Sequence, residues 1–215
     1  MESPATRLMR NPVFSRIYQK AWRPIFTRGF SLGGHATADY DKALRAYLCR
    51  PGERMVLDIA CGPGNYTRHI AVGLTGDGQV VGVDYSAPML ATAVATNSAG
   101  RASYLRVDAH AIPFSDNSFD EVICLAALYL IPDPLPVLDE MMRVALPGGL
   151  LVVFTSVAGP ISTLPGVRTL AGIGGYRVFD RDEITGRLRD LGAEHIEQTL
   201  IDEGQYVLCR KPSGA

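Results

Sequence analysis

The stretch Val56-Leu57-Asp58-Ile59-Ala60-Cys61-Gly62-Pro63-Gly64-Asn65-Tyr66-Thr67 decides the fold. It begins as an apolar run typical of a buried strand and passes into a glycine-rich turn. Apolar residues at one-turn spacing follow at Tyr66, Ile70 and Leu74, a pattern that predicts a helix. Glycines let a ligand approach the backbone, and free N–H groups at a helix start attract negative charge. The stretch therefore predicts a strand, a ligand-contacting turn and a helix.

The residues around the turn narrow the kind of ligand. A dinucleotide fingerprint needs a third glycine where this chain has Thr67, and it does not usually carry an acid such as Asp58 before the turn. A carboxylate there would repel a pyrophosphate but accept hydrogen bonds from an ammonium group. The sequence predicts a ligand with a cationic group at Asp58. The alternative is that Asp58 accepts a structural hydrogen bond from the turn.

Two further predicted strands end in acids. Asp84 ends an apolar strand twenty residues beyond Gly64, where a carboxylate binds ribose hydroxyls in nucleoside-binding βαβ units. Helix capping is the alternative role for Asp84. The next predicted strand, 103–108, ends in Asp108. Three neighbouring strands are therefore expected to present Asp58, Asp84 and Asp108 at their carboxyl ends.

The motifs at these turns resemble those of one family. They are Asp58-Ile59-Ala60-Cys61-Gly62-Pro63-Gly64, Gly82-Val83-Asp84, Asp108-Ala109 and Leu146-Pro147-Gly148-Gly149. Over residues 53–154 the chain resembles a class I S-adenosylmethionine-dependent methyltransferase, and it is most similar to the small-molecule enzymes of ubiquinone and menaquinone biosynthesis. The resemblance implies a Rossmann-like, doubly wound α/β fold. Its seven-stranded, mostly parallel sheet would have the order 3-2-1-4-5-7-6, with strand 7 antiparallel and an N-terminal helical cap.

The resemblance also implies S-adenosyl-L-methionine as the cofactor and S-adenosyl-L-homocysteine as the product. By this analogy Asp108 would bind the adenine amino group, and His110 would pack around the adenine rather than transfer protons. The implied cofactor-binding residues lie in the three turns and at the end of the fourth strand: Asp58, Ala60, Cys61, Gly62, Gly64, Asn65, Asp84, Tyr85, Met89, Asp108, Ala109, His110 and Leu125.

The methyl acceptor is expected to be a small, apolar or amphiphilic molecule that is methylated at oxygen or carbon. Its site is expected to include Tyr18, Trp22, His35, Tyr40 and Tyr129. No obligate catalytic residue is expected, because a tyrosine with a pKa of ~10 is a poor base at neutral pH; Tyr129 and His35 would orient the acceptor. The alternatives are a non-catalytic S-adenosylmethionine-binding subunit and a nicotinamide-dependent reductase. The residues at the glycine turn disfavour the reductase.

Two parts are expected along the chain, a helical cap or lid over residues 1–50 and the cofactor-binding core over residues 51–215. The glycine- and proline-rich segment 156–179 is expected to be irregular and to cover the substrate. Local patterns predict helices over 36–48, from Ser86 to about 96, from Asp133-Pro134, and after a capping box at 180–183; strands over 119–125 and 150–155; and a hairpin over 194–200 and 204–210.

The N-terminal arm is basic. Residues 3–38 contain no acid, but they contain Arg7, Arg10, Arg16, Lys20, Arg23 and Arg28. We interpret these residues as the solvated face of a helix. The alternatives are contact with an acidic membrane surface and, against the presence of Glu2, a mitochondrial transit peptide.

The composition, 47% hydrophobic with a formal net charge of −1, is typical of a soluble globular protein and gives no overall attraction to nucleic acid. The cysteines predict neither a zinc site nor a disulfide framework, and they favour a reducing cytoplasm, because they are far apart: Cys49, Cys61, Cys124 and Cys209. No set of metal ligands is recognisable. Glu121, Asp133 and Asp139 are interpreted as surface and capping residues.

Overall fold

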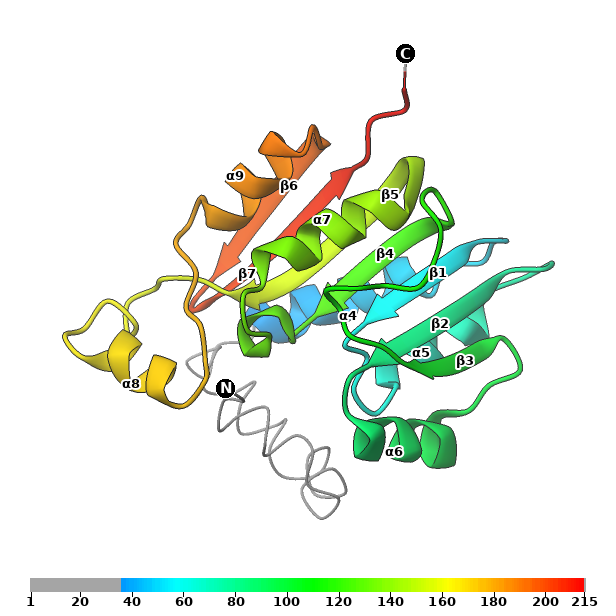
Figure 1. The fold of residues 1–215 in the computed structure, drawn as a ribbon, viewed down its shortest axis with the longest axis horizontal. Coiled ribbons are helices and arrows are strands. Elements are labelled where there is room, and N and C mark those ends of the chain that lie inside the picture. Colours follow the sequence, from blue (N-terminus) through cyan, green and yellow to red (C-terminus); the bar gives the residue numbers. More distant parts are fainter. Residues whose placement is uncertain (1–35, 215) are drawn as a thin grey trace.

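A computed structural model describes residues 36–214, which form a seven-stranded sheet with the order β3-β2-β1-β4-β5-β7-β6 (Figure 1). Strand β7 runs antiparallel to both of its neighbours, and the other pairs are parallel. The predicted strand order and the antiparallel seventh strand are confirmed. The strands are β1 Met55–Ile59, β2 Gln79–Asp84, β3 Ala102–Arg106, β4 Phe119–Leu125, β5 Ala145–Ser156, β6 Glu194–Ile201 and β7 Gly204–Arg210.

Helices cover both faces of this sheet. In Figure 1, α7 and α9 lie in front of the sheet and α4 and α5 lie behind it, while α6 lies beside β2 and β3. The described helices are α4 Ala36–Leu48, α5 Asn65–Gly73, α6 Ala87–Asn97, the 3₁₀ turn η2 Leu128–Leu130, α7 Leu135–Val144, α8 Val167–Ile173 and α9 Glu183–Asp190. No helix among residues 36–214 is long and apolar enough to cross a membrane.

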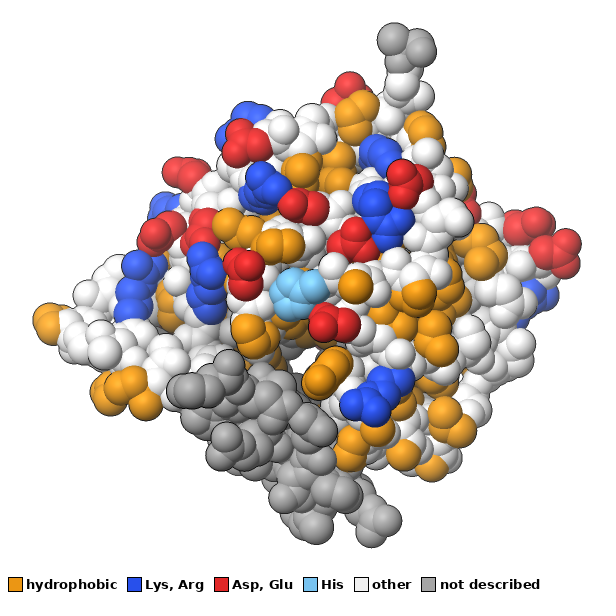
Figure 2. Space-filling model, in the orientation of Figure 1, with side chains coloured by type: hydrophobic (Ala, Val, Ile, Leu, Met, Phe, Trp, Pro, Cys, Tyr) orange, Lys and Arg blue, Asp and Glu red, His pale blue; other side chains and the backbone are white. Residues whose placement is uncertain are grey.

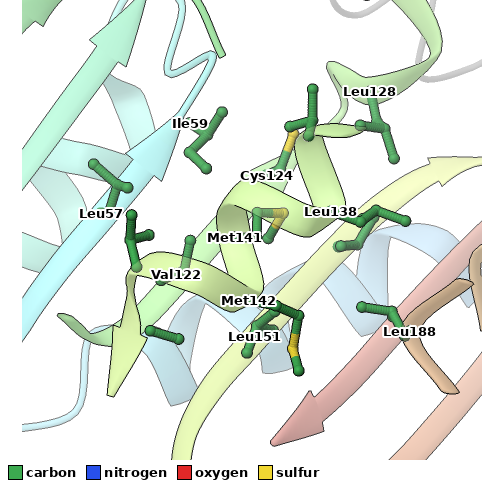
Figure 3. Close-up of a cluster of buried hydrophobic side chains, with 14 of the residues drawn as sticks. Leu57, Ile59, Val122, Cys124, Leu128, Leu138, Met141, Met142, Leu151 and Leu188 are labelled. Carbon is green, nitrogen blue, oxygen red and sulfur yellow. The ribbon is translucent and has the colours of Figure 1, made fainter. Parts of the chain in front are cut away.

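Two hydrophobic clusters hold the layers together. Side chains alternate across a strand, so that Leu57 points toward α7 while its neighbour Val56 points toward α4 and α5. The front cluster joins Leu57 to Leu138 and Met141 of α7 (Figure 3). Because the central strands are buried on both faces, they read as continuous apolar runs rather than as alternating ones.

Helix α4 is firmly packed against the back of the sheet. Leu44 and Leu48 are buried in the rear cluster. Asp41 accepts hydrogen bonds from Arg45 at 2.7 Å and from the hydroxyl of Tyr66, and the Arg45 guanidinium lies 4.5 Å from the centre of the Tyr66 ring. The predicted boundary near residue 50 between a cap and a core stays a prediction, since residues 1–35 lie outside the described part.

The loop 107–118 replaces a helix between β3 and β4, and α7 fixes its position. The Arg143 guanidinium donates hydrogen bonds to the carbonyl oxygens of Ile112 at 2.9 Å and Phe114 at 2.8 Å. Glu140 accepts the backbone N–H of Ile112 at 2.8 Å and pairs with Arg143 at 2.7 Å. A loop without its own secondary structure thus has its backbone groups satisfied by one helix.

Removal of the Arg143 side chain tests this anchoring. We expect Arg143→Ala to lower the free energy of unfolding by about 1–3 kcal/mol, because two loop carbonyls lose their donors and Glu140 loses its cation. Arg189→Ala is the matched control, since Arg189 also lies in the last turn of a helix but is exposed. Urea unfolding of both variants measures the difference; equal stability would show that the loop needs no anchor.

Three predictions about charged residues need correction. Glu121 is not a surface residue, because it is 2% exposed and paired with both Arg50 and Arg54, the latter at 3.2 Å. Asp133 does not cap a helix, because its backbone is left-handed (φ 46°) and α7 begins two residues later at Leu135. Strand β3 ends at Arg106, so that Asp108 lies in the following loop and not at the strand end.

Element boundaries differ elsewhere in smaller ways. Strand β5 begins at Ala145 rather than at 150, and its first residues include Gly148 with φ 76°. The segment 156–179 contains the short helix α8 and is not wholly irregular. At α9 half of the predicted capping box is present: the Glu183 carboxylate accepts the backbone N–H of Asp180 at 3.1 Å, but Asp182 makes no side-chain cap. The predicted Ser86 cap of α6 is confirmed by its bond from the Met89 N–H.

Candidate cofactor and acceptor site

The glycine turn lies between β1 and α5 at the carboxyl edge of the sheet, where Figure 2 shows the surface hollowed beside the loops after β3 and β4. The backbone is left-handed at Ala60 (φ 54°), Gly62 (φ 56°) and Gly64 (φ 77°). A Cβ added at Gly62 would meet no atom within 4 Å, whereas one at Gly64 would overlap the ring of Tyr104. Gly64 is therefore required for internal packing, and Gly62 leaves its side of the turn open to a ligand.

Asp84 connects this turn to the next one. Its two carboxylate oxygens accept the backbone N–H of Gly62 at 2.8 Å and the backbone N–H of Ser86 at 2.7 Å. Burial raises the pKa of Asp84 and outweighs these two hydrogen bonds, which lower it. Each carboxylate oxygen keeps a second lone pair, so the group can still accept hydrogen bonds from ligand hydroxyls.

Substitution of Asp84 tests its predicted role toward ribose. We expect Asp84→Ala to weaken binding of S-adenosylhomocysteine by about 1.5–3 kcal/mol, the contribution of hydrogen bonds to a charged group, which is about tenfold to a hundredfold in Kd. Asp77→Ala, at the exposed turn that precedes β2, is the control and should leave Kd unchanged. Calorimetric titration of both variants measures the effect. Equal affinities would leave Asp84 with a purely structural role.

Asp58 lies deeper than Asp84. Its side chain is 2% exposed, and it accepts a hydrogen bond from the Thr67 hydroxyl at 2.6 Å. Burial, with a smaller effect from the charge of Asp84, raises the pKa of Asp58 to about 7 even though the Thr67 bond lowers it. The structural hydrogen bond that we considered as an alternative is thus present. A role of Asp58 toward a cationic ligand group stays a prediction.

Asp108 and His110 lie together in the loop after β3. Asp108 is 55% exposed and accepts both the backbone N–H and a hydrogen bond from the ring of His110. These two bonds lower the pKa of Asp108. The backbone N–H of Val107 donates to the carbonyl of Asp84 at 3.1 Å, which places this loop directly beside the β2 turn.

The other predicted cofactor residues lie in the same turns or at adjoining strand ends. Tyr85 is exposed and lies 5.5 Å from the Arg106 guanidinium, while Met89 is buried in the first turn of α6. Asn65 accepts a hydrogen bond from Asn97 of α6 at 3.1 Å. The rest are placed as follows: Cys61 in the glycine turn, Ala109 against the front cluster, and Leu125 at the end of β4 against the rear cluster.

The structure does not bring together the predicted acceptor residues that it describes. Tyr18, Trp22 and His35 lie outside the described residues. Tyr129 of η2 is 3% exposed and belongs to the front cluster, whereas Tyr40 of α4 packs on Tyr206 behind the sheet, with ring centres 4.2 Å apart. The described structure therefore places Tyr40 and Tyr129 on opposite faces.

Tyr176 is a residue that the sequence reasoning missed. Its ring lies 4.6 Å from that of Tyr129, and the next residue, Arg177, donates its backbone N–H to the Tyr129 carbonyl at 2.9 Å. Tyr176 follows two glycines in the segment 156–179, and an aromatic residue in a glycine-rich segment was the available signal. The segment thus packs on η2, and its helix α8 leaves Leu170 and Ile173 exposed.

The fold and the turns can be compared with those of known proteins. Residues 57–153, from β1 to β5, match the family described as methyltransferase domain. The fold is similar to that of an S-adenosylmethionine-dependent methyltransferase from Aquifex aeolicus, with a TM-score of 0.68 and 19% identity over 94% of this chain and 98% of that one. From β1 to β5 the chain is thus similar to methyltransferase domains, and its fold is the one found in S-adenosylmethionine-dependent methyltransferases.

Two further comparisons concern the cofactor and the acceptor. A phosphoethanolamine N-methyltransferase of Haemonchus contortus, solved with S-adenosyl-L-methionine, has a TM-score of 0.68 and 20% identity over 84% of this chain and 53% of that one. A demethylmenaquinone methyltransferase of Lactiplantibacillus plantarum is 37% identical over 126 residues, which are 57% of this chain and 52% of that protein. The chain spans about half the length of the curated relatives it matches.

Proposed function

We propose that this protein transfers a methyl group from S-adenosyl-L-methionine to oxygen or carbon of a small, apolar or amphiphilic acceptor. The observation that carries the proposal is the buried carboxylate of Asp58 and the half-buried carboxylate of Asp84, beside the open backbone of Gly62. Demethylmenaquinone methyltransferases are similar to part of this chain. Their name favours an acceptor of the same chemical class, a quinone with an apolar tail.

The side chains have separate roles toward the cofactor. Asp84 binds the ribose hydroxyls, Asp58 faces the ammonium group and Asp108 accepts from the adenine amino group. The fit is supported by the open space over Gly62, by the buried carboxylate of Asp58 and by the half-buried carboxylate of Asp84, which favour hydroxyl and ammonium groups over a pyrophosphate. When bound, the cofactor supplies an electrophilic methyl group on its sulfonium.

Positioning and exclusion of water are the remaining tasks of the chain. An acceptor held in line with the methyl–sulfur bond reacts without an obligate base if its oxygen or carbon is already nucleophilic. Tyr129 and Tyr176 face each other beside the end of β4 and orient the acceptor. Burial raises the pKa of Tyr176, so its hydroxyl remains protonated at neutral pH and acts as a hydrogen-bond donor rather than as a base.

Two measurements test this proposal. Calorimetry should show S-adenosylhomocysteine binding at about micromolar Kd and no NADH binding. Incubation with methyl-labelled cofactor and a prenylated naphthoquinol that lacks the ring methyl should then transfer label to the organic-soluble product. Binding of NADH without S-adenosylhomocysteine would favour a reductase. Tight S-adenosylhomocysteine binding without transfer to any acceptor fraction would favour the non-catalytic subunit.

A further inference from the structure

His110 connects the loop after β3 to the segment 131–134 that precedes α7. Its Nδ1 lies 2.8 Å from Oδ1 of Asp108, the same oxygen that accepts the His110 backbone N–H at 3.0 Å. Its Nε2 lies 2.9 Å from the carbonyl oxygen of Pro132 and 3.0 Å from that of Asp133. Both ring nitrogens therefore face oxygen atoms that can only accept hydrogen bonds.

This arrangement is satisfied by one protonation state of the ring. A neutral imidazole has a single N–H and would turn a lone pair toward either the Asp108 carboxylate or the two carbonyls, whereas an imidazolium donates at both ends. Burial lowers the pKa of His110, but the bonds to Asp108, Asp133 and Pro132 outweigh burial and raise it. Asp108 is the charged side chain that faces the ring from its own loop. On the facing segment 131–134, Asp133 is the one titratable residue.

The two ends of this bridge belong to different halves of the site. Asp108 lies beside the β2 turn, on the side assigned to the cofactor. The segment 131–134 directly follows η2, which carries Tyr129, on the side assigned to the acceptor. Arg143 and Glu140 anchor the loop further along, at Ile112 and Phe114. Together with the bond from the Val107 N–H to the Asp84 carbonyl, His110 thus fixes the part of the loop assigned to the cofactor.

We propose that His110 is a positioning residue: by donating hydrogen bonds from both ring nitrogens, it holds the Asp108 loop against the segment 131–134 in the position that binds adenine. This inference rests on the proposed function, because it assigns Asp108 to the cofactor. The bridge is complete at low pH and is lost as the pH rises through the pKa of His110. The contribution of His110 to cofactor affinity should therefore be lost on the alkaline side, with kcat unchanged.

The first test is calorimetry with S-adenosylhomocysteine at about pH 6.5 and about pH 8.5. The titration of Asp58 changes the affinity of every variant alike, so the measured quantity is the affinity of each protein relative to that of His110→Gln at the same pH. For the wild type we expect this ratio to fall about two- to fivefold at the higher pH, the range that a partly exposed ion pair supports. His195→Gln, which changes an exposed histidine on β6, is the matched control and should show the same fall in the ratio.

The second test needs no cofactor. Nitrogen-15 NMR of the unliganded protein should show both ring nitrogens of His110 protonated at about pH 6.5, and amide exchange at residues 108–112 should be faster in His110→Gln. A neutral His110 ring at that pH, or a ratio of wild-type to His110→Gln affinity that is the same at both pH values, would overturn the proposal. Absence of S-adenosylhomocysteine binding at every pH would instead overturn the proposed function, and the NMR result would still decide whether the bridge exists.

Discussion

Asp58→Asn is expected to stabilise the unliganded protein at about pH 8 and to weaken cofactor binding strongly. The pKa of Asp58 is about 7 in the folded protein, mainly because of burial, against 3.8 for an unperturbed aspartate. Proton binding therefore favours the folded state at low pH, and this contribution is lost as the pH rises from about 4 to about 7. Asparagine carries no charge and can still accept the Thr67 hydrogen bond. The free energy of unfolding of Asp58→Asn should exceed that of the wild type by up to roughly 4 kcal/mol at about pH 8, and this difference should vanish below about pH 4.

The expected loss of cofactor binding also follows from the buried charge of Asp58. No ion pair within residues 36–214 engages Asp58, so we expect the cofactor ammonium to supply the opposite charge. Asp58→Asn should raise the Kd of S-adenosylhomocysteine about tenfold to a hundredfold, and the wild-type affinity should fall as the pH drops below 7. Thermal unfolding at two pH values and calorimetry measure both effects. A variant that is less stable at about pH 8 but binds normally would assign Asp58 to the turn alone.

Gly62→Ala is expected to remove cofactor binding while the protein still folds. The left-handed backbone at Gly62 costs an alanine about 1–2 kcal/mol, but its Cβ would meet no atom of residues 36–214 within 4 Å. The open space is where the cofactor approaches the backbone, so the added methyl group should clash with the ligand. We expect at least about a tenfold rise in the Kd of S-adenosylhomocysteine.

Two other glycines provide the controls for this substitution. Gly100→Ala also points a Cβ into open space but has no left-handed backbone, and it should change neither stability nor binding. Gly64→Ala has both the left-handed backbone and the overlap with Tyr104, and it should be less stable than Gly62→Ala. Circular dichroism and calorimetry on all three variants separate the effect on stability from the effect on cofactor binding. Unaltered binding by a folded Gly62→Ala would place the cofactor elsewhere.

The central part of the fold was predictable because local and long-range signals agree there. The apolar runs that form β1, β2 and β4 are each buried on both faces, and turn residues that permit only a few conformations separate them from the helices. Ser86 illustrates this agreement, since a serine before Ala87-Pro88 predicts a helix cap and the structure shows its bond to Met89. The sheet order itself came from the resemblance, because periodicity alone does not determine how strands pair.

Residues whose environment depends on distant contacts were not predictable. Glu121 interrupts an apolar strand, and only the folded chain brings Arg50 and Arg54 to its buried carboxylate. The Asp133-Pro134 pair resembles a helix start, but the Asp133 carbonyl lies against His110, and Pro136 occupies the first turn of α7 instead. In both cases a contact between residues far apart in the sequence outweighs the conformation that the neighbouring residues favour.

The candidate site also has a part that could be predicted from the sequence and a part that could not. The glycine turn and the strand-end acids Asp58 and Asp84 could be placed from spacing. Tyr176 and the His110 bridge could not, because their partners lie 47 and 22 residues away along the chain, at Tyr129 and Pro132. The acceptor side is the less predictable half, since it is built from connections whose conformation depends on packing rather than on a repeating pattern.

The most direct test of the proposed function is to incubate the protein with methyl-labelled S-adenosylmethionine and cell extract, and then to fractionate the products. We expect label in the organic-soluble or small-metabolite fraction, and we expect it to disappear with Asp84→Ala but not with Asp77→Ala. Label found mainly in the tRNA, DNA or protein fraction, with the small-molecule fractions empty, would contradict transfer to a small acceptor.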